Sequence, residues 1–179
     1  MKAETALRET LIAAALGILA AGAEPSLRAV ARAAGVSAMA PYRHFPDKAG
    51  LLAAVADHGF RRLGRVLRIA DDRDDAREAL FAQGMAYVDF ARANPALFRL
   101  MYSDDYGHAS ADAVRGTYEV LARRVAGIVP AHAVAATLAC RSLVQGMATI
   151  ALGGRLMAAP EDIAIALRVF VSGLGTARA

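Results

Sequence analysis

The sequence lacks the features of a secreted, disulfide-bonded or β-rich protein. Its 179 residues contain one cysteine, Cys140, so no internal disulfide can form and a reducing compartment, the cytoplasm, is expected. The amino terminus has neither the basic segment nor the apolar core of a signal peptide. β-Branched runs that would mark strands are sparse, whereas alanine is abundant. These absences favour an all-α protein.

Motifs that carry catalysis or hold a metal are also missing. The histidines lack a metal-ligand spacing such as H-E-x-x-H, there is no G-x-S-x-G, and "LGGR" lacks the lysine of a phosphate loop. Asp104, Asp105 and His108 could form an acid–base cluster, but a solvated loop is the simpler interpretation. Cys140 lies in an apolar stretch, which suits a buried thiol better than a nucleophile. We therefore predict no catalytic residue, no metal site and no cofactor.

Basic charge is concentrated in the first third of the chain. Residues 1–68 hold ten Lys or Arg and five Asp or Glu, a balance of +5, whereas residues 69–179 hold eleven and twelve, a balance of −1. A polyanionic partner for the first third is one interpretation, and a solvated basic face is the other. Charge alone does not decide between them.

Apolar residues that recur every three or four positions predict a series of helices. Gly22 suits the left-handed cap of the first helix, Asp47 is the expected N-cap of the long helix that follows it, and Asp75 with Glu78 resembles a capping box. The acidic "DDRDD", residues 71–75, is the clearest boundary along the chain. The predicted helices span residues 4–22, 27–34, 38–44, 48–68, 76–93, 95–101, 111–128, 132–154 and 161–173.

Two of these helices are short and are joined by Gly35, Val36 and Ser37, which is typical of a helix-turn-helix. Gly35 permits the positive φ of a sharp turn, and the small Ala31 lets the two helices cross closely. Pro41 falls early in the third helix, with its ring expected to face inward. Helical bundles use similar turns, so this pattern alone leaves DNA binding and a purely structural role open.

The stretch "SLRAVARAAGVSAMAPYRHFPDKAGLLAAVA" resembles the DNA-binding domain of the tetracycline-repressor (TetR) family. The likeness lies in the Gly-Val-Ser turn, Tyr-x-His-Phe, and Asp-Lys followed by Leu-Leu. It implies a DNA-binding domain over residues 3–65, with its helix-turn-helix at 26–45, and a ligand-binding and dimerisation domain over 75–175. The implied function is a cytoplasmic, homodimeric repressor that binds a palindromic operator in double-stranded DNA and is released by a small effector. A helical protein-interaction module or small enzyme without DNA binding remains the alternative.

The resemblance also implies roles for residues at matching positions. Tyr42 and Lys48 match phosphate-contacting positions, and Arg28 matches a position that reaches a base edge. Because the side chains of Ala38 and Met39 form no strong hydrogen bonds, base readout would rest on arginines and on apolar contacts to thymine methyl groups. Tyr42 could instead pack on the following helix, and His44 could be an ordinary surface histidine. The predicted DNA-binding residues are Arg28, Ser37, Ala38, Met39, Tyr42, Arg43, His44 and Lys48.

Large apolar side chains gather beyond residue 75, where they form a plain core or line a cavity for an apolar or amphipathic effector. Arg141 and Gln145 lie one helical turn apart and would supply polar ligand contacts if they face inward. The candidate ligand-binding residues are Phe81, Met85, Phe98, Met101, Tyr102, Tyr118, Arg141, Gln145 and Met147. The segments "FARANPALFRLMYS" and "SLVQGMATIAL" resemble a subgroup named for Trp-His-Gly (WHG), although this chain has no tryptophan and carries Gln145-Gly146 where His-Gly would stand.

Residues 133–152 form an apolar stretch long enough to span a membrane, but Arg141 near its middle favours a packed helix and no membrane partner. We expect residues 132–154 and 161–173 to form the dimer interface. Small side chains there would allow close approach, and larger ones would supply apolar area. The expected interface residues are Ala135, Ala136, Leu138, Ala139, Leu143, Gly146, Ala148, Ile163, Leu167 and Phe170.

Overall fold

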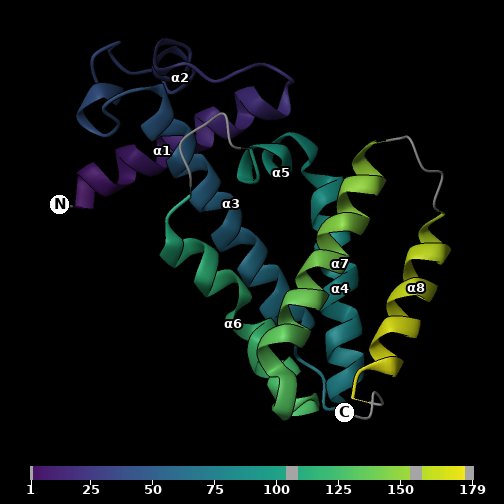
Figure 1. Cartoon of the computed structure of the whole chain (residues 1–179). Coiled ribbons are helices and arrows are strands. Elements are labelled where there is room, and N and C mark those ends of the chain that lie inside the picture. The colour runs from purple at the N-terminus through teal and green to yellow at the C-terminus, as the bar shows by residue number, and fades with distance from the viewer. Residues whose placement is uncertain (1, 104–108, 154–158, 176–179) are drawn as a thin grey trace. The chain divides into compact units, whose positions relative to one another are not determined.

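The computed structural model describes residues 2–103, 109–153 and 159–175, which form helices and contain no strand (Figure 1). The all-α prediction is confirmed, and three of the predicted helices begin and end at the expected residues. Asp104, Asp105 and His108 lie outside the described residues. The α-helices are α1 (Lys2–Ala20), α2 (Leu27–Ala33), α3 (Lys48–Ala70), α4 (Ala76–Ala93), α5 (Pro95–Met101), α6 (Ala111–Ile128), α7 (Ala133–Gly153) and α8 (Pro160–Gly173), and the 3₁₀ helices are η1 (Pro41–Arg43) and η2 (Pro130–His132).

The predicted α-helix over residues 38–44 is wrong in type, because this segment is a turn followed by η1. Pro41 has no N–H to donate, and in an α-helix its ring would clash with the carbonyl of Ser37. That carbonyl instead accepts the amide of Ala40 at 3.0 Å, as in a tighter 3₁₀ turn. Pro41 is buried at the start of η1, so its inward orientation was predicted correctly.

The chain divides into two compact units, which do not follow the sequence continuously. The first unit contains residues 1–61 and 94–114, so α5 belongs with the amino-terminal helices. The second contains residues 62–93 and 115–179. The predicted domains, in contrast, run continuously over residues 3–65 and 75–175.

In the first unit, α1 packs against α2 and α5, and α2 packs against η1. Its core contains aliphatic side chains, with Leu11 and Leu51 fully buried, and aromatic ones such as Phe45 and Phe98. α5 lies close to α3, since a Cβ atom on Gly59 would come within 2.6 Å of the sulfur of Met101. This packing anchors the helix-turn-helix on the buried core of the first unit.

In the second unit, α4 packs against both α7 and α8. Gly84 permits the close approach of α8, because a Cβ atom at this position would lie 3.0 Å from Cδ2 of Leu167. Asp75 caps α4, because its carboxylate accepts the amides of Arg77 and Glu78, both at 2.8 Å, but the Glu78 half of the predicted capping box does not form. The side chain of Glu78 pairs with Arg168 of α8 at 2.9 Å.

One helical stretch of the described chain, Pro130–Gly153, is long and apolar enough to cross a membrane. Its middle is nevertheless packed within the second unit, where Cys140 and Val144 are buried and the guanidinium of Arg141 lies 3.9 Å from the ring centre of Tyr118. A stacked arginine and a buried face are expected of a helix in a packed bundle.

The predicted interface residues are partly misassigned. Ala148, Ile163 and Leu167 are buried in the core of their own unit, because they lie on the faces of α7 and α8 that turn toward it. The large apolar side chains that these helices leave exposed are Val134, Leu138, Ile150, Ile165 and Val169.

Candidate nucleic-acid interface and effector cavity

The turn of the helix-turn-helix has the predicted geometry. Gly35 has a φ of 66°, in the left-handed region that favours glycine. Ala31, at the crossing of the two elements, is 2% exposed. The side chain of Ser26 accepts the amide of Ala29 at 3.2 Å and so caps α2. These features fix where the neighbouring side chains of α2 and η1 reach the surface.

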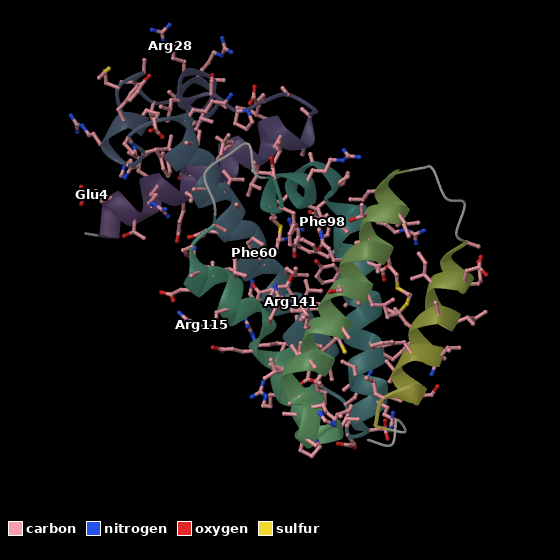
Figure 2. The ribbon with its side chains drawn as sticks, in the orientation of Figure 1. Glu4, Arg28, Phe60, Phe98, Arg115 and Arg141 are labelled. Carbon is pink, nitrogen blue, oxygen red and sulfur yellow. The ribbon has the colours of Figure 1, made fainter. Side chains whose placement is uncertain are left out.

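Most of the predicted DNA-binding residues lie on the surface of the first unit. Arg28 projects outward from the beginning of α2 (Figure 2). Met39 and Tyr42 are 67% and 45% exposed, which is unusual for large apolar side chains and leaves both accessible to a partner. The exposed members of the set are Arg28, Ser37, Ala38, Met39, Tyr42 and Arg43, while His44 and Lys48 are half-buried.

Lys48 is the first residue of α3, directly after the capping residue Asp47. The carboxylate of Asp47 accepts the amide of Gly50 at 2.7 Å, which confirms the predicted cap. The ammonium of Lys48 lies 2.5 Å from a carboxylate oxygen of Glu24. An anion thus offsets the unfavourable position of a lysine at a helix amino terminus, and a DNA phosphate would have to compete with this carboxylate.

We expect Glu24→Gln to raise the affinity for duplex DNA about two- to fivefold at low salt, since it removes the anion that competes for Lys48. Fluorescence anisotropy with a labelled duplex measures the change, and the gain should shrink as salt is added. Glu4→Gln makes the same charge change at an exposed position of α1 and is the control. A loss of affinity in Glu24→Gln alone would mean that Glu24 positions Lys48 for DNA.

Two further residues of this surface were not predicted from the sequence. Arg32 is exposed and lies four residues after Arg28, which places both arginines on one face of α2. That spacing is visible in the sequence and was a usable signal. Glu24, in contrast, precedes Lys48 by twenty-four residues, and no local pattern connects the two.

The second unit contains a cavity of about 30 Å³. Side chains from α3, α4, α6, α7 and α8 line it, and they are mostly apolar. Pockets that hold drug-sized ligands measure roughly 300–1,000 Å³, so an effector larger than a few atoms enters only if the lining moves. The lining residues are Leu67, Leu80, Gln83, Gly84, Tyr87, Tyr118, Leu121, Cys140, Leu143, Val144, Leu167, Phe170 and Val171.

The candidate ligand residues are not brought together around this cavity. Of the nine, Tyr118 lines it, and Arg141 and Gln145 lie directly behind its wall. Arg141 stacks on Tyr118, and Gln145 accepts a short hydrogen bond from the hydroxyl of the lining residue Tyr87. Phe98, Met101 and Tyr102 belong to the first unit, where the rings of Phe98 and Tyr102 pack at 4.9 Å. The remaining three, Phe81, Met85 and Met147, are half-buried in the second unit.

Cys140 lines the cavity and is 4% exposed. Burial raises the pKa of its thiol to about 11, since the thiolate would lose its hydration. The thiol is therefore protonated near neutral pH, in agreement with the structural role predicted for it.

A helix-turn-helix with exposed arginines is typical of DNA-binding proteins. Family models support this and are more specific. The model of bacterial regulatory proteins of the tetR family matches residues 11–55, and the tetracyclin repressor-like C-terminal domain matches residues 80–174. The chain belongs to the TetR family and is a DNA-binding transcription regulator rather than an enzyme.

Solved structures share this fold over nearly the whole chain. A protein of unknown function from Rhodococcus sp. RHA1 is 35% identical, with a TM-score of 0.81 over 94% of this chain and 95% of that one. A regulatory protein of the tetR family from Rhodococcus RHA1 is 25% identical, with a TM-score of 0.67 over 96% and 98%. A single-substitution variant of TetR from Acinetobacter baumannii AYE, solved in complex with minocycline, is 22% identical, with a TM-score of 0.70 over 96% and 97%. A search of curated proteins finds no match.

Proposed function

We propose that this regulator is a homodimeric repressor that binds a palindromic operator in the cytoplasm and is released by a small, largely apolar effector. The observation that carries the proposal is the exposed set on α2, η1 and the turn between them, which contains arginines as well as Met39 and Tyr42 on a helix-turn-helix of TetR type. Arginines neutralise phosphates and read guanine edges, while apolar side chains contact thymine methyl groups. One surface thus offers both kinds of DNA contact.

The residues of this surface divide into two roles. Tyr42 and Lys48 are proposed to contact phosphates, because a hydroxyl and an ammonium at these positions suit backbone oxygens. Arg28 and Arg43, both exposed, are proposed to reach base edges. Ser37, Ala38 and His44 complete the surface between them, with the alternative that the half-buried His44 is an ordinary surface histidine without a role in DNA binding.

Selection of bound duplexes from random DNA tests the proposal. We expect the parent protein to enrich two inverted half-sites separated by about one helical turn or a multiple of it, because a two-fold dimer imposes its symmetry on the site. Arg28→Ala should relax preference at one base pair per half-site, with a loss of about 1–3 kcal/mol. Enrichment of no motif, or an unchanged motif in the variant, would contradict the assignment.

The proposed dimer joins α7 and α8 of two chains. Val134 and Leu138 on α7 are 88% and 64% exposed, and Ile165 and Val169 on α8 are 60% and 67% exposed. Exposed apolar side chains on two helices that both pack on α4 indicate a contact surface. The apolar stretch that is long enough to cross a membrane includes α7. In the proposed dimer the partner chain, rather than lipid, covers the exposed apolar face of this helix.

The cavity in the second unit supports effector binding. It is lined by apolar side chains with a few polar groups, as ligand sites usually are. The related fold of the Acinetobacter TetR variant was solved with minocycline. An effector that binds one state of the dimer more tightly shifts the population toward it, typically by about 1–3 kcal/mol. Release of DNA requires that this state fit the operator less well.

A further inference from the structure

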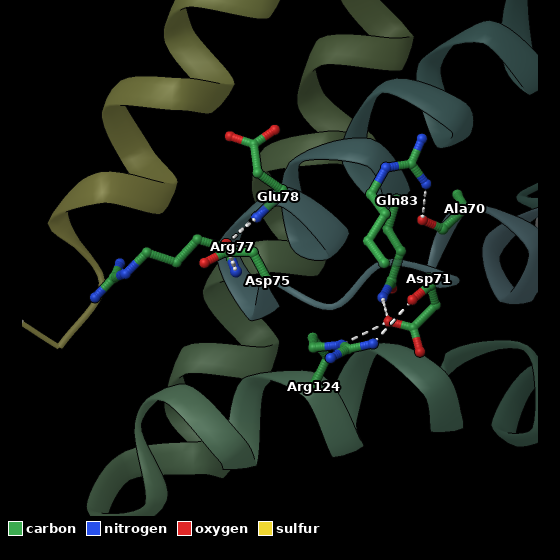
Figure 3. Close-up of polar contacts among 8 residues, drawn as sticks. Ala70, Asp71, Asp75, Arg77, Glu78, Gln83 and Arg124 are labelled. Atoms are coloured by element: carbon green, nitrogen blue, oxygen red, sulfur yellow. Dashed lines mark hydrogen bonds and ion pairs between the residues drawn. The ribbon is translucent and has the colours of Figure 1, made fainter.

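Gln83 is a cavity-lining residue with a buried side-chain amide. One of the two polar atoms of this amide has a hydrogen-bond partner and the other has none among the described residues. Gln83 lines the cavity from α4 and is 2% exposed. Its Nε2 donates to Oδ1 of Asp71 at 2.7 Å (Figure 3). Nε of Arg124 donates to the same oxygen at 2.7 Å, and a terminal nitrogen of Arg124 donates to the Asp71 carbonyl at 2.8 Å. The hydrogen bond to Asp71 raises the pKa of Arg124 above its ordinary value.

These contacts fix the orientation of the amide. An ionised carboxylate only accepts hydrogen bonds, so the atom of Gln83 that faces Asp71 must be the NH₂ group. The other atom, Oε1, is buried, and no donor among the described residues reaches it. A buried acceptor without a partner is costly and uncommon in folded proteins. The residue that carries it lines a cavity that is otherwise largely apolar, and a ligand reaches Oε1 when the lining moves.

We propose that the cavity binds a compact, uncharged molecule, with an apolar body and one hydroxyl or N–H group that donates to Oε1 of Gln83. This inference rests on the proposed function, because it takes the cavity as the effector site. An anionic ligand fits poorly, since its charge would face the lone pairs of Oε1 with the carboxylate of Asp71 behind them. Arg141 could attract an anion, but it stacks on Tyr118 and does not line the cavity.

The position of Asp71 gives such a ligand a connection to the DNA-binding helices. Asp71 follows Ala70, the last residue of α3, and α3 begins at Lys48 of the proposed phosphate-binding set. A hydrogen bond from the ligand to Oε1 polarises the Gln83 amide. The hydrogen bond from Nε2 to Asp71 then becomes stronger, because linked hydrogen bonds reinforce one another. Ligand binding thus tightens the attachment of α4 to the end of α3.

Three probes of similar shape test the chemistry by fluorine NMR titration. 4-Fluorophenol carries a donor and is uncharged near neutral pH, 4-fluorotoluene lacks the donor, and 4-fluorobenzoate is an anion. We expect the protein to bind 4-fluorophenol about five- to tenfold more tightly than 4-fluorotoluene, and to bind 4-fluorobenzoate most weakly. Equal affinities for the first two, tightest binding of the benzoate, or binding of none of them would overturn the inference.

Gln83→Met keeps the length of the side chain and removes Oε1, so the preference for 4-fluorophenol should disappear. Leu121→Met alters an apolar residue of the same lining, leaves Oε1 of Gln83 and its contact with Asp71 in place, and should keep the preference. If Gln83→Met does not fold, the side-chain amide resonances of Gln83 in the parent protein decide. They should shift with 4-fluorophenol and not with 4-fluorotoluene, and the absence of that difference would overturn the inference.

Anisotropy of a selected duplex separates this inference from the proposed function. In one outcome, 4-fluorophenol binds with the expected preference while the affinity for DNA is unchanged. That result would support the Gln83 ligand site and contradict release of DNA by the effector. If an apolar molecule without a hydrogen-bond donor releases the selected DNA as readily as 4-fluorophenol does, the proposed function is supported. The proposed contact of the ligand with Gln83 is then wrong.

Discussion

Glutamates in place of Leu138 and Val169 should convert the protein from a dimer to a monomer and lower its affinity for a two-half-site duplex at least about 100-fold. Both residues are among the exposed apolar side chains of α7 and α8. A charge at either position would be buried against the partner chain without a counter-ion, which is strongly unfavourable. A monomer contacts one half-site and loses the roughly 10²–10⁴-fold gain that comes from linking two binding units.

Sedimentation at micromolar concentration measures the mass, and anisotropy measures the affinity for DNA. Ile69→Glu is the matched control, because Ile69 is 76% exposed and lies at the end of α3, outside the proposed interface. The control should remain dimeric and bind DNA as the parent does. A dimeric mass for the double variant would place the interface elsewhere on the chain.

Much of the fold follows from local patterns that the sequence displays directly. Asp47 and Asp75 cap α3 and α4 as expected, because a carboxylate before an apolar repeat has few other local partners. Gly35 adopts the positive φ that its turn requires. The α-helix predicted after Ser37 is wrong because Pro41, although early in the segment, is incompatible with α-helical hydrogen bonding there. The missing N–H and the clash at Ser37 favour a 3₁₀ turn instead.

The features that the sequence did not reveal depend on contacts between distant residues. Whether Leu138 or Leu167 faces outward is set by the rotation of each helix against α4, and both helices are apolar on more than one side. The pairing of Lys48 with Glu24 joins two elements, and the environment of Gln83 depends on Asp71 and Arg124. Composition predicted an effector-binding domain with apolar side chains, but the residues it indicated were Phe, Met and Tyr rather than one buried amide.

Leu167→Ala should lower the free energy of unfolding by about 2–5 kcal/mol. Leu167 is 2% exposed and packs on Gly84, which has no side chain that could fill the space. Arg77 also holds α8 in place, donating to the carbonyls of Val171 and Leu174 at 2.5 and 2.7 Å. Collapse of α8 onto α4 is therefore resisted, and we expect a cost in the upper half of the range.

Denaturant unfolding at one fixed protein concentration measures this change, because the stability of a dimer depends on concentration. Ile69→Ala removes the same number of carbon atoms from an exposed position and should change stability by less than about 0.5 kcal/mol. Similar losses in the two variants would show that Leu167 is not a core residue.

The space left by Leu167→Ala adjoins the cavity, so the variant should also gain affinity for an apolar molecule. Engineered apolar cavities stay dry and bind small aromatic compounds, and a ligand at 100 times its Kd stabilises a protein by about 2.7 kcal/mol. We expect 4-fluorotoluene to restore much of the lost stability in the variant and to do little for the parent protein. A low cost of the substitution with no rescue would mean that α8 moves to fill the space. A high cost with no rescue would mean that the enlarged cavity is closed to ligands, and that the effector reaches Gln83 by another opening or not at all.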